Sequence, residues 1–141
     1  AIEVHGKGEV LAHINPQEIR QVVLNLVTNA LESLDTDGAV SIDIDTDGTT
    51  AAIAIIDNGC GMSDEVLKHI FEPFFTRRRD GTGTGLGLSI TYRIISQHGG
   101  SLTAHSEGEG RGSRMEILLP VEPDGNDTPL NRNSLGLTHE R

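Results

Sequence analysis

Two asparagines one helical turn apart, Asn25 and Asn29, are the residues of this 141-residue chain whose type and spacing point most directly to chemistry. One turn of helix places both side chains on the same side. A carboxamide is a poor proton acceptor, but its oxygen can bind magnesium and its NH2 group can donate to phosphate. We therefore interpret Asn29 as a candidate metal ligand, and Asn25 as facing the same phosphates or a metal-bound water. Two asparagines on a helix surface are the plain alternative.

An acidic residue followed by glycines forms a second candidate motif, Asp57-Asn58-Gly59-Cys60-Gly61. Glycine lets a backbone pass close to a flat ring, and a carboxylate can accept a hydrogen bond from the exocyclic amine of adenine. At the corresponding position guanine has a carbonyl oxygen, which cannot donate. An ordinary aspartate turn after a strand is the alternative.

A glycine-rich segment, Gly83-Thr84-Gly85-Leu86-Gly87-Leu88, leads into a predicted helix. The free N–H groups of a helix N-terminus suit phosphate. The segment does not follow an opening strand, as it would in a dinucleotide-binding fold, and it lacks the Gly-Lys-Ser/Thr ending of a P-loop. A flexible loop before a helix is the alternative.

Composition limits the class of protein. The chain has 35% hydrophobic and 3% aromatic residues, enough for one cored domain built from aliphatic side chains, which suits a sheet packed against helices. A net charge of -10 argues against nucleic acid as a main partner. Apolar runs such as residues 51–56 are too short for a membrane helix, so we expect no membrane contact by this chain. The single cysteine, Cys60, and the absence of a secretory segment favour a cytoplasmic location.

A long helix is predicted to carry the asparagine pair. Asn15 can cap it, Pro16 suits the first helical position and Glu18 completes a capping box, so we expect a helix from there to about Leu34. Its apolar positions recur every three or four residues and predict one buried stripe. The stripe comprises Ile19, Val22, Val23, Leu26, Val27, Ala30, Leu31 and Leu34.

The remaining elements follow from alternation, turns and caps. Ser63 can cap a short helix that ends near Phe71, and the segment from Pro73 to Gly83 has no periodicity, so we interpret it as a mobile lid. Residues 121–141 are poor in apolar side chains and predict a disordered tail or linker after a domain of residues 1–120. Strands are predicted over residues 1–5, 39–45, 50–56, 101–106 and 113–119, and a second long helix over residues 86–98.

In this order the motifs resemble those of the ATP-binding catalytic domain of sensor histidine kinases, in the superfamily shared with gyrase and heat-shock chaperone ATPases. The resemblance covers roughly residues 9–119. It is carried by Asn25-Leu26-Val27-Thr28-Asn29-Ala30, Asp57-Asn58-Gly59-Cys60-Gly61-Met62, Phe71-Glu72-Pro73-Phe74-Phe75-Thr76, Gly83-Thr84-Gly85-Leu86-Gly87-Leu88 and Gly110-Arg111-Gly112-Ser113.

The resemblance implies an α+β fold of the Bergerat type, a two-layer sandwich in which about three helices cover one face of a mixed sheet. ATP would lie between two helices under a flexible lid. It also implies roles for residues at matching positions: Asn29 for Mg2+, Asn25 for phosphate, Asp57 for adenine, and Gly59 and Gly61 for the approach of the ring. The other implied contacts with the nucleotide or its lid are Phe71, Phe74, Gly83, Thr84, Gly85, Leu86, Gly87, Leu88 and Ser113. For Phe71, Phe74 and Phe75, ordinary core packing is the alternative.

One position separates branches of the superfamily. Its hydrolysing members have a glutamate one turn before the metal asparagine, where this chain has Asn25. An amide cannot take a proton from water, so the site is expected to hold ATP for a stronger nucleophile, a histidine imidazole. Glu32 departs from relatives with a basic residue there, which leaves residues 77–79, three arginines, as candidates to meet phosphate charge. A solvated basic loop that docks on the partner domain is the alternative.

The resemblance therefore implies a protein histidine kinase domain with ATP and Mg2+ as cofactors. None of the six histidines lies in a long amphipathic helix of the kind that carries a phosphoacceptor, so we expect the acceptor outside this chain. The implied partners are the phosphoacceptor/dimerisation domain of the same parent kinase and a downstream response regulator, and the isolated domain is expected to be monomeric. A slow ATP hydrolase and a nucleotide-sensing or docking module are the alternatives.

Overall fold

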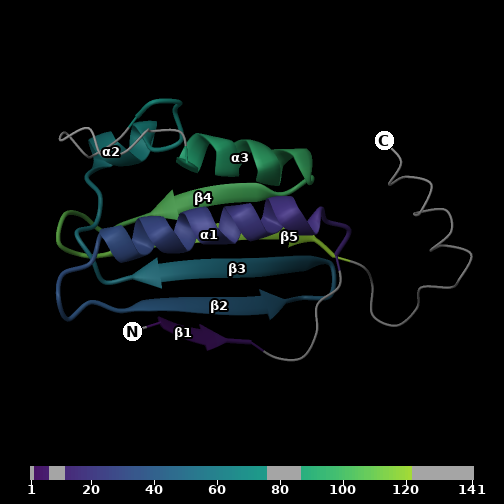
Figure 1. The fold of residues 1–141 in the computed structure, drawn as a ribbon, viewed down its shortest axis with the longest axis horizontal. Helices are drawn as coiled ribbons and strands as arrows, with labels where there is room; N and C mark the ends of the chain where they lie inside the picture. Colours follow the sequence, from purple (N-terminus) through teal and green to yellow (C-terminus); the bar gives the residue numbers. More distant parts are fainter. Residues whose placement is uncertain (1, 7–11, 76–86, 122–141) are drawn as a thin grey trace, which may run out of the picture.

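The computed structural model describes residues 2–6, 12–75 and 87–121. They form one five-stranded sheet with helices on one face (Figure 1). Along the chain the elements are β1 (Ile2–His5), α1 (Pro16–Glu32), β2 (Val40–Thr46), β3 (Thr50–Asp57), α2 (Asp64–His69), α3 (Gly87–Gln97), β4 (Ser101–His105) and β5 (Ser113–Pro120).

The sheet has the strand order β1-β2-β3-β5-β4. Strands β1 and β2 are parallel, and every other neighbouring pair is antiparallel, which confirms the predicted mixed sheet. The register pairs Asp57, the last residue of β3, with Val40 on one side and with Ser113 on the other. The alternation of β3 therefore delivers Asp57 to the same face as the buried Ile55.

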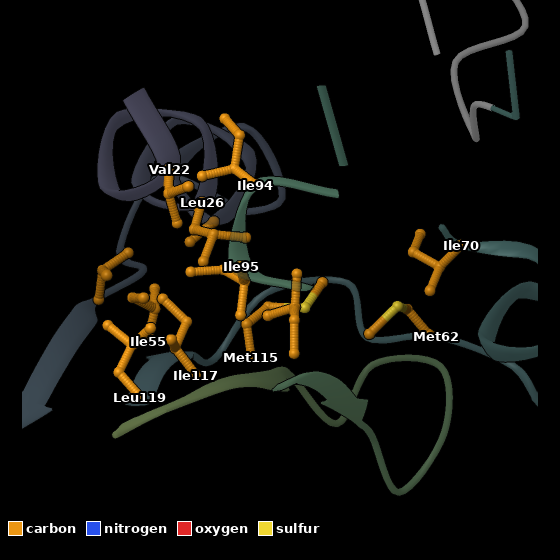
Figure 2. Close-up of a cluster of buried hydrophobic side chains, with 13 residues drawn as sticks. Val22, Leu26, Ile55, Met62, Ile70, Ile94, Ile95, Met115, Ile117 and Leu119 are labelled. Atoms are coloured by element: carbon orange, nitrogen blue, oxygen red, sulfur yellow. The ribbon is translucent and has the colours of Figure 1, made fainter. Parts of the chain in front are cut away.

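Helices α1 and α3 pack side by side and run in opposite directions over the sheet (Figure 1). In Figure 2, Val22 and Leu26 of α1 and Ile95 of α3 point toward a layer of strand side chains, and Ile94 of α3 lies against α1. That layer includes Ile55, Met115, Ile117 and Leu119. Met62 and Ile70, on either side of α2, lie at one side of the cluster. The two-layer α+β sandwich expected from the sequence is thus confirmed.

Helix α1 begins as predicted and ends earlier. The Asn15 side chain accepts hydrogen bonds from the backbone N–H groups of Gln17 and Glu18, and Pro16 occupies the first turn. The helix ends at Glu32, two residues before the expected end. The expectation that Leu31 is buried is wrong, because its side chain is 41% exposed. The fully buried stripe of α1 is narrower than predicted and consists of Val22, Leu26 and Ala30.

Helix α2 begins as predicted and ends at His69, before the expected end near Phe71, and the described strands and α3 lie within one residue of their predicted bounds. Ser63 caps α2, and Asp47 accepts hydrogen bonds from the Thr49 and Thr50 N–H groups in the β2–β3 turn. Among the described residues no helix is long and apolar enough to cross a membrane. The predicted lid from residue 76 onward, the arginines at residues 77–79, Gly83, Thr84, Gly85, Leu86 and the predicted tail after residue 121 lie outside the described residues.

Candidate functional site

The carboxylate of Asp57 is the most buried acidic side chain of the described chain, with an exposure of 6%. Its Oδ1 accepts a hydrogen bond of 2.9 Å from the Gly59 N–H, and its Oδ2 accepts one of 2.7 Å from the Ser113 hydroxyl. The second bond follows from the β3–β5 register, which pairs the two residues. No described cationic side chain pairs with the Asp57 carboxylate. Each of its oxygens accepts one hydrogen bond and can accept another, so this buried group has room for a further donor.

The loop after Asp57 is hydrogen-bonded to two neighbouring segments of the chain. The Cys60 N–H donates to the Ser33 carbonyl beyond the end of α1, at 3.0 Å. On the other side, the Gly110 N–H donates to the Cys60 carbonyl at 2.7 Å, and the Met62 N–H donates to the Ser106 hydroxyl oxygen at 2.9 Å. Residues 58–62 are therefore held between α1 and the β4–β5 turn, which fixes the surroundings of Asp57.

Three glycines are required where these segments meet. A Cβ on Gly59 would collide with the backbone and hydroxyl of Ser33. Gly61 and Gly112 have positive φ angles of 66° and 70°, and a Cβ on either would collide with a backbone carbonyl of the opposite segment. Contacts within the protein thus account for Gly59 and Gly61, and their predicted closeness to an adenine ring stays a prediction.

The two asparagines of α1 are both half-buried but differ in their partners. Asn25 faces α3: its Nδ2 donates to the Thr91 hydroxyl at 3.3 Å and to the Gly87 carbonyl at 3.4 Å, and its Oδ1 accepts from Gln21 at 2.7 Å. The side chain of Asn29, one turn later, makes no hydrogen bond to a described residue. Asn25 is therefore engaged between the helices, while the carboxamide of Asn29 is uncommitted within the described part of the chain.

The start of α3 and the phenylalanines complete the predicted set. Gly87 is the first residue of α3, and Leu88 packs against the core. Phe71 stacks on Tyr92 with ring centroids 5.2 Å apart and, like Phe75, packs against the core. Phe74 is 74% exposed with a φ of 67°, so the core-packing alternative fails for it.

Sequence reasoning missed several polar residues that build this region. Thr91 is fully buried between α1 and α3, and Ser106 joins the Asp57 loop to the β4–β5 turn. Asn58 accepts from the Ala39 N–H at 2.8 Å and ties the loop to the start of β2. Thr91 occupies an apolar-stripe position of α3, three residues before Ile94, and that spacing could have shown its burial.

Comparison with known proteins gives a coherent result. Residues 14–123 match the family described as histidine kinase-, DNA gyrase B-, and HSP90-like ATPase. Sensor histidine kinase ZraS of Escherichia coli K12 is 37% identical over 107 residues, which cover 76% of this chain and 22% of the relative. This chain thus spans less than a quarter of the length of that protein.

Solved structures give the same picture. The catalytic domain of histidine kinase ThkA is 31% identical with a TM-score of 0.75, over 86% of this chain and 80% of that one. The mycobacterial sensor histidine kinase MprB is 27% identical with a TM-score of 0.78, over 86% and 84%. ThkA has also been solved in complex with the response regulator protein TrrA, where the match is 28% identical with a TM-score of 0.70, over 89% of this chain and 35% of that one.

Proposed function

Because this chain belongs to the histidine kinase-, DNA gyrase B- and HSP90-like ATPase family, among the catalytic domains of histidine kinases, we propose that it presents Mg-ATP to a histidine of a separate domain. Family membership implies ATP binding. The histidine acceptor, the metal and the roles of single residues are the parts that we propose.

The residues around Asp57 fit an adenine. A carboxylate that is 6% exposed and has no described cationic partner is costly unless donors reach it, and Ser113 and Gly59 supply only one donor each. The exocyclic amine of adenine is a further donor of the correct kind. We assign Asp57 to adenine recognition and Ser113 to the orientation of its carboxylate, with Gly59 and Gly61 keeping the loop in place.

The α1 amides fit the metal-phosphate end of the nucleotide. Asn29 has an oxygen that no described residue uses, and amide oxygens are suitable ligands for Mg2+. Magnesium, when bound, neutralises charge on the transferred phosphoryl group. We assign Asn29 to the metal and Asn25 to the same end of the site. The proposed phosphate contacts at Gly83, Thr84, Gly85 and Leu86 rest on sequence alone, and those at Gly87 and Leu88 fit the start of α3.

The lack of a general base at Asn25 favours phosphotransfer over hydrolysis. Its three partners among the described residues are the Gln21 amide, the Thr91 hydroxyl and the Gly87 carbonyl, and none of them can act as a general base at neutral pH. Water would therefore attack without assistance from this position. A neutral imidazole needs no such assistance, which favours an incoming histidine.

The proposed partners follow from this chemistry. We propose that the acceptor histidine belongs to a dimerisation domain of the same parent kinase, and that a response regulator receives the phosphoryl group, as the complex of ThkA with TrrA suggests. We further propose a cytoplasmic location for the domain and a monomeric state for the isolated chain.

Transfer can be tested with radiolabelled ATP, Mg2+ and the acceptor domain of the parent kinase. We expect acid-labile phosphate on the acceptor and little phosphate release without it. Asn25→Glu, which introduces a base, should raise acceptor-independent hydrolysis, whereas the exposed Gln17→Glu on the same helix should not. Release of phosphate by the wild type alone, lost in Asn25→Ala, would indicate a hydrolase. ATP binding without transfer or release would indicate a sensing module.

A further inference from the structure

The carboxamide of Asn25 has one defined orientation between α1 and α3. The Gly87 carbonyl can only accept hydrogen bonds, so the group that faces it at 3.4 Å must be the NH2 of Asn25. The oxygen then lies toward Gln21, whose NH2 donates to it at 2.7 Å. The Gly87 carbonyl therefore assigns the NH2 end of the Asn25 amide, the oxygen end follows from it, and the Gln21 amide can donate to that oxygen.

Thr91 gives this orientation a second, buried anchor. Its side chain is 0% exposed, and its hydroxyl donates its single proton to the Gly87 carbonyl at 2.8 Å. With that proton committed, the hydroxyl oxygen can only accept in the direction of Asn25, whose Nδ2 lies 3.3 Å away. Thr91 thus rejects the flipped amide, because a carbonyl oxygen there would face a lone pair.

We propose that Thr91 is a positioning residue of the nucleotide site, which holds the NH2 of Asn25 against α3 and leaves the Asn25 oxygen as the group available to a ligand. The inference rests on the proposed function, because Asn25 is assigned to the nucleotide site there. Gln21 occupies one lone pair of that oxygen, which leaves the second for an incoming donor or cation.

A packing role alone would not require the hydroxyl. Valine has the same branched shape as threonine and suits the fully buried position of Thr91, which lies on the same buried face of α3 as Ile94 and Ile95. Thr91→Val therefore removes the acceptor with little change in shape, and Thr91→Ser keeps the acceptor with a smaller side chain. Thr28→Val, at an exposed position of α1, is the matched control.

The first readout uses the nucleotide-free chain and the side-chain NH2 resonances of Asn25. We expect these resonances to move in Thr91→Val and to stay near their wild-type positions in Thr91→Ser and Thr28→Val, while the NH2 resonances of Asn29 do not move. Unchanged Asn25 resonances in a folded Thr91→Val would overturn the inference.

The second readout is affinity for a non-hydrolysable ATP analogue with Mg2+, measured by calorimetry. Loss of one neutral hydrogen bond of typical strength predicts an affinity about fivefold weaker for Thr91→Val. Because Thr91 would act through Asn25, adding Thr91→Val to the Asn25→Ala variant should not weaken the affinity for the analogue further. An equal loss on both backgrounds would show a purely structural role and overturn the inference. If the wild type itself does not bind the analogue, the proposed function fails, and the resonances still decide the orientation.

Discussion

Replacing Ser113 by alanine removes the hydroxyl that donates to Asp57 Oδ2 over 2.7 Å. Both side chains are buried, with exposures of 6% for Asp57 and 8% for Ser113, so water replaces the lost donor poorly. A hydrogen bond to a charged group contributes about 1.5–3 kcal/mol. We therefore expect the free energy of unfolding to fall by about 2 kcal/mol, and the melting temperature of a domain of this size to fall by roughly 8 °C.

Urea unfolding followed by circular dichroism measures this change, since the chain has no tryptophan to report by fluorescence. Ser101→Ala is the matched control, because Ser101 is an exposed strand residue whose side chain makes no hydrogen bond within the described chain. A Ser113→Ala variant that unfolds within about 0.5 kcal/mol of Ser101→Ala would refute the view that this buried bond stabilises the site.

Two further changes test the loop packing and the surface electrostatics. Gly112→Ala and Gly110→Ala both force alanine into positive φ, but only the Cβ at position 112 meets a carbonyl, that of Asp57. The free energy of unfolding of Gly112→Ala should therefore be lower than that of Gly110→Ala by at least about 1 kcal/mol. Equal unfolding free energies for the two variants would contradict the packing. The hydrogen bond and charge of Glu72 raise the pKa of His69 above its ordinary 6.5, so protonated His69 stabilises the fold below that pH and the contribution is lost as pH rises through the folded-state pKa. Glu72→Gln should therefore lower the melting temperature more at about pH 5.5 than at about pH 8.5, and an NMR titration giving the same His69 pKa in both proteins would contradict this.

Local signals predicted the elements that carry the site. The cap and proline at residues 15 and 16 define the start of α1 because capping involves only neighbouring backbone groups. The apolar run of residues 50–56 predicted a strand that ends just before Asp57, and the structure confirms Asp57 at the end of β3. The family resemblance and the mixed sheet covered by helices are likewise confirmed.

Contacts between distant segments could not be read from local patterns. Asp57 and Ser113 are 56 positions apart, and their hydrogen bond depends on the pairing of two strands that no single turn connects. Periodicity placed Leu31 in the buried stripe, but α3 and the sheet cover only a narrower part of α1. The hydrogen bond of Asn25 to Thr91 likewise joins residues 66 positions apart and requires the packing of α1 against α3.

The central claim is that the buried carboxylate at the end of β3 recognises the adenine of ATP, and calorimetric titration with ATP and Mg2+ tests it most directly. We predict that the wild type binds ATP and binds GTP much more weakly. Asp57→Asn should lose ATP affinity by about tenfold or more, while Asp37→Asn, at an exposed position outside the site, should bind as the wild type does. A folded Asp57→Asn variant that binds ATP as tightly as the wild type would contradict the account.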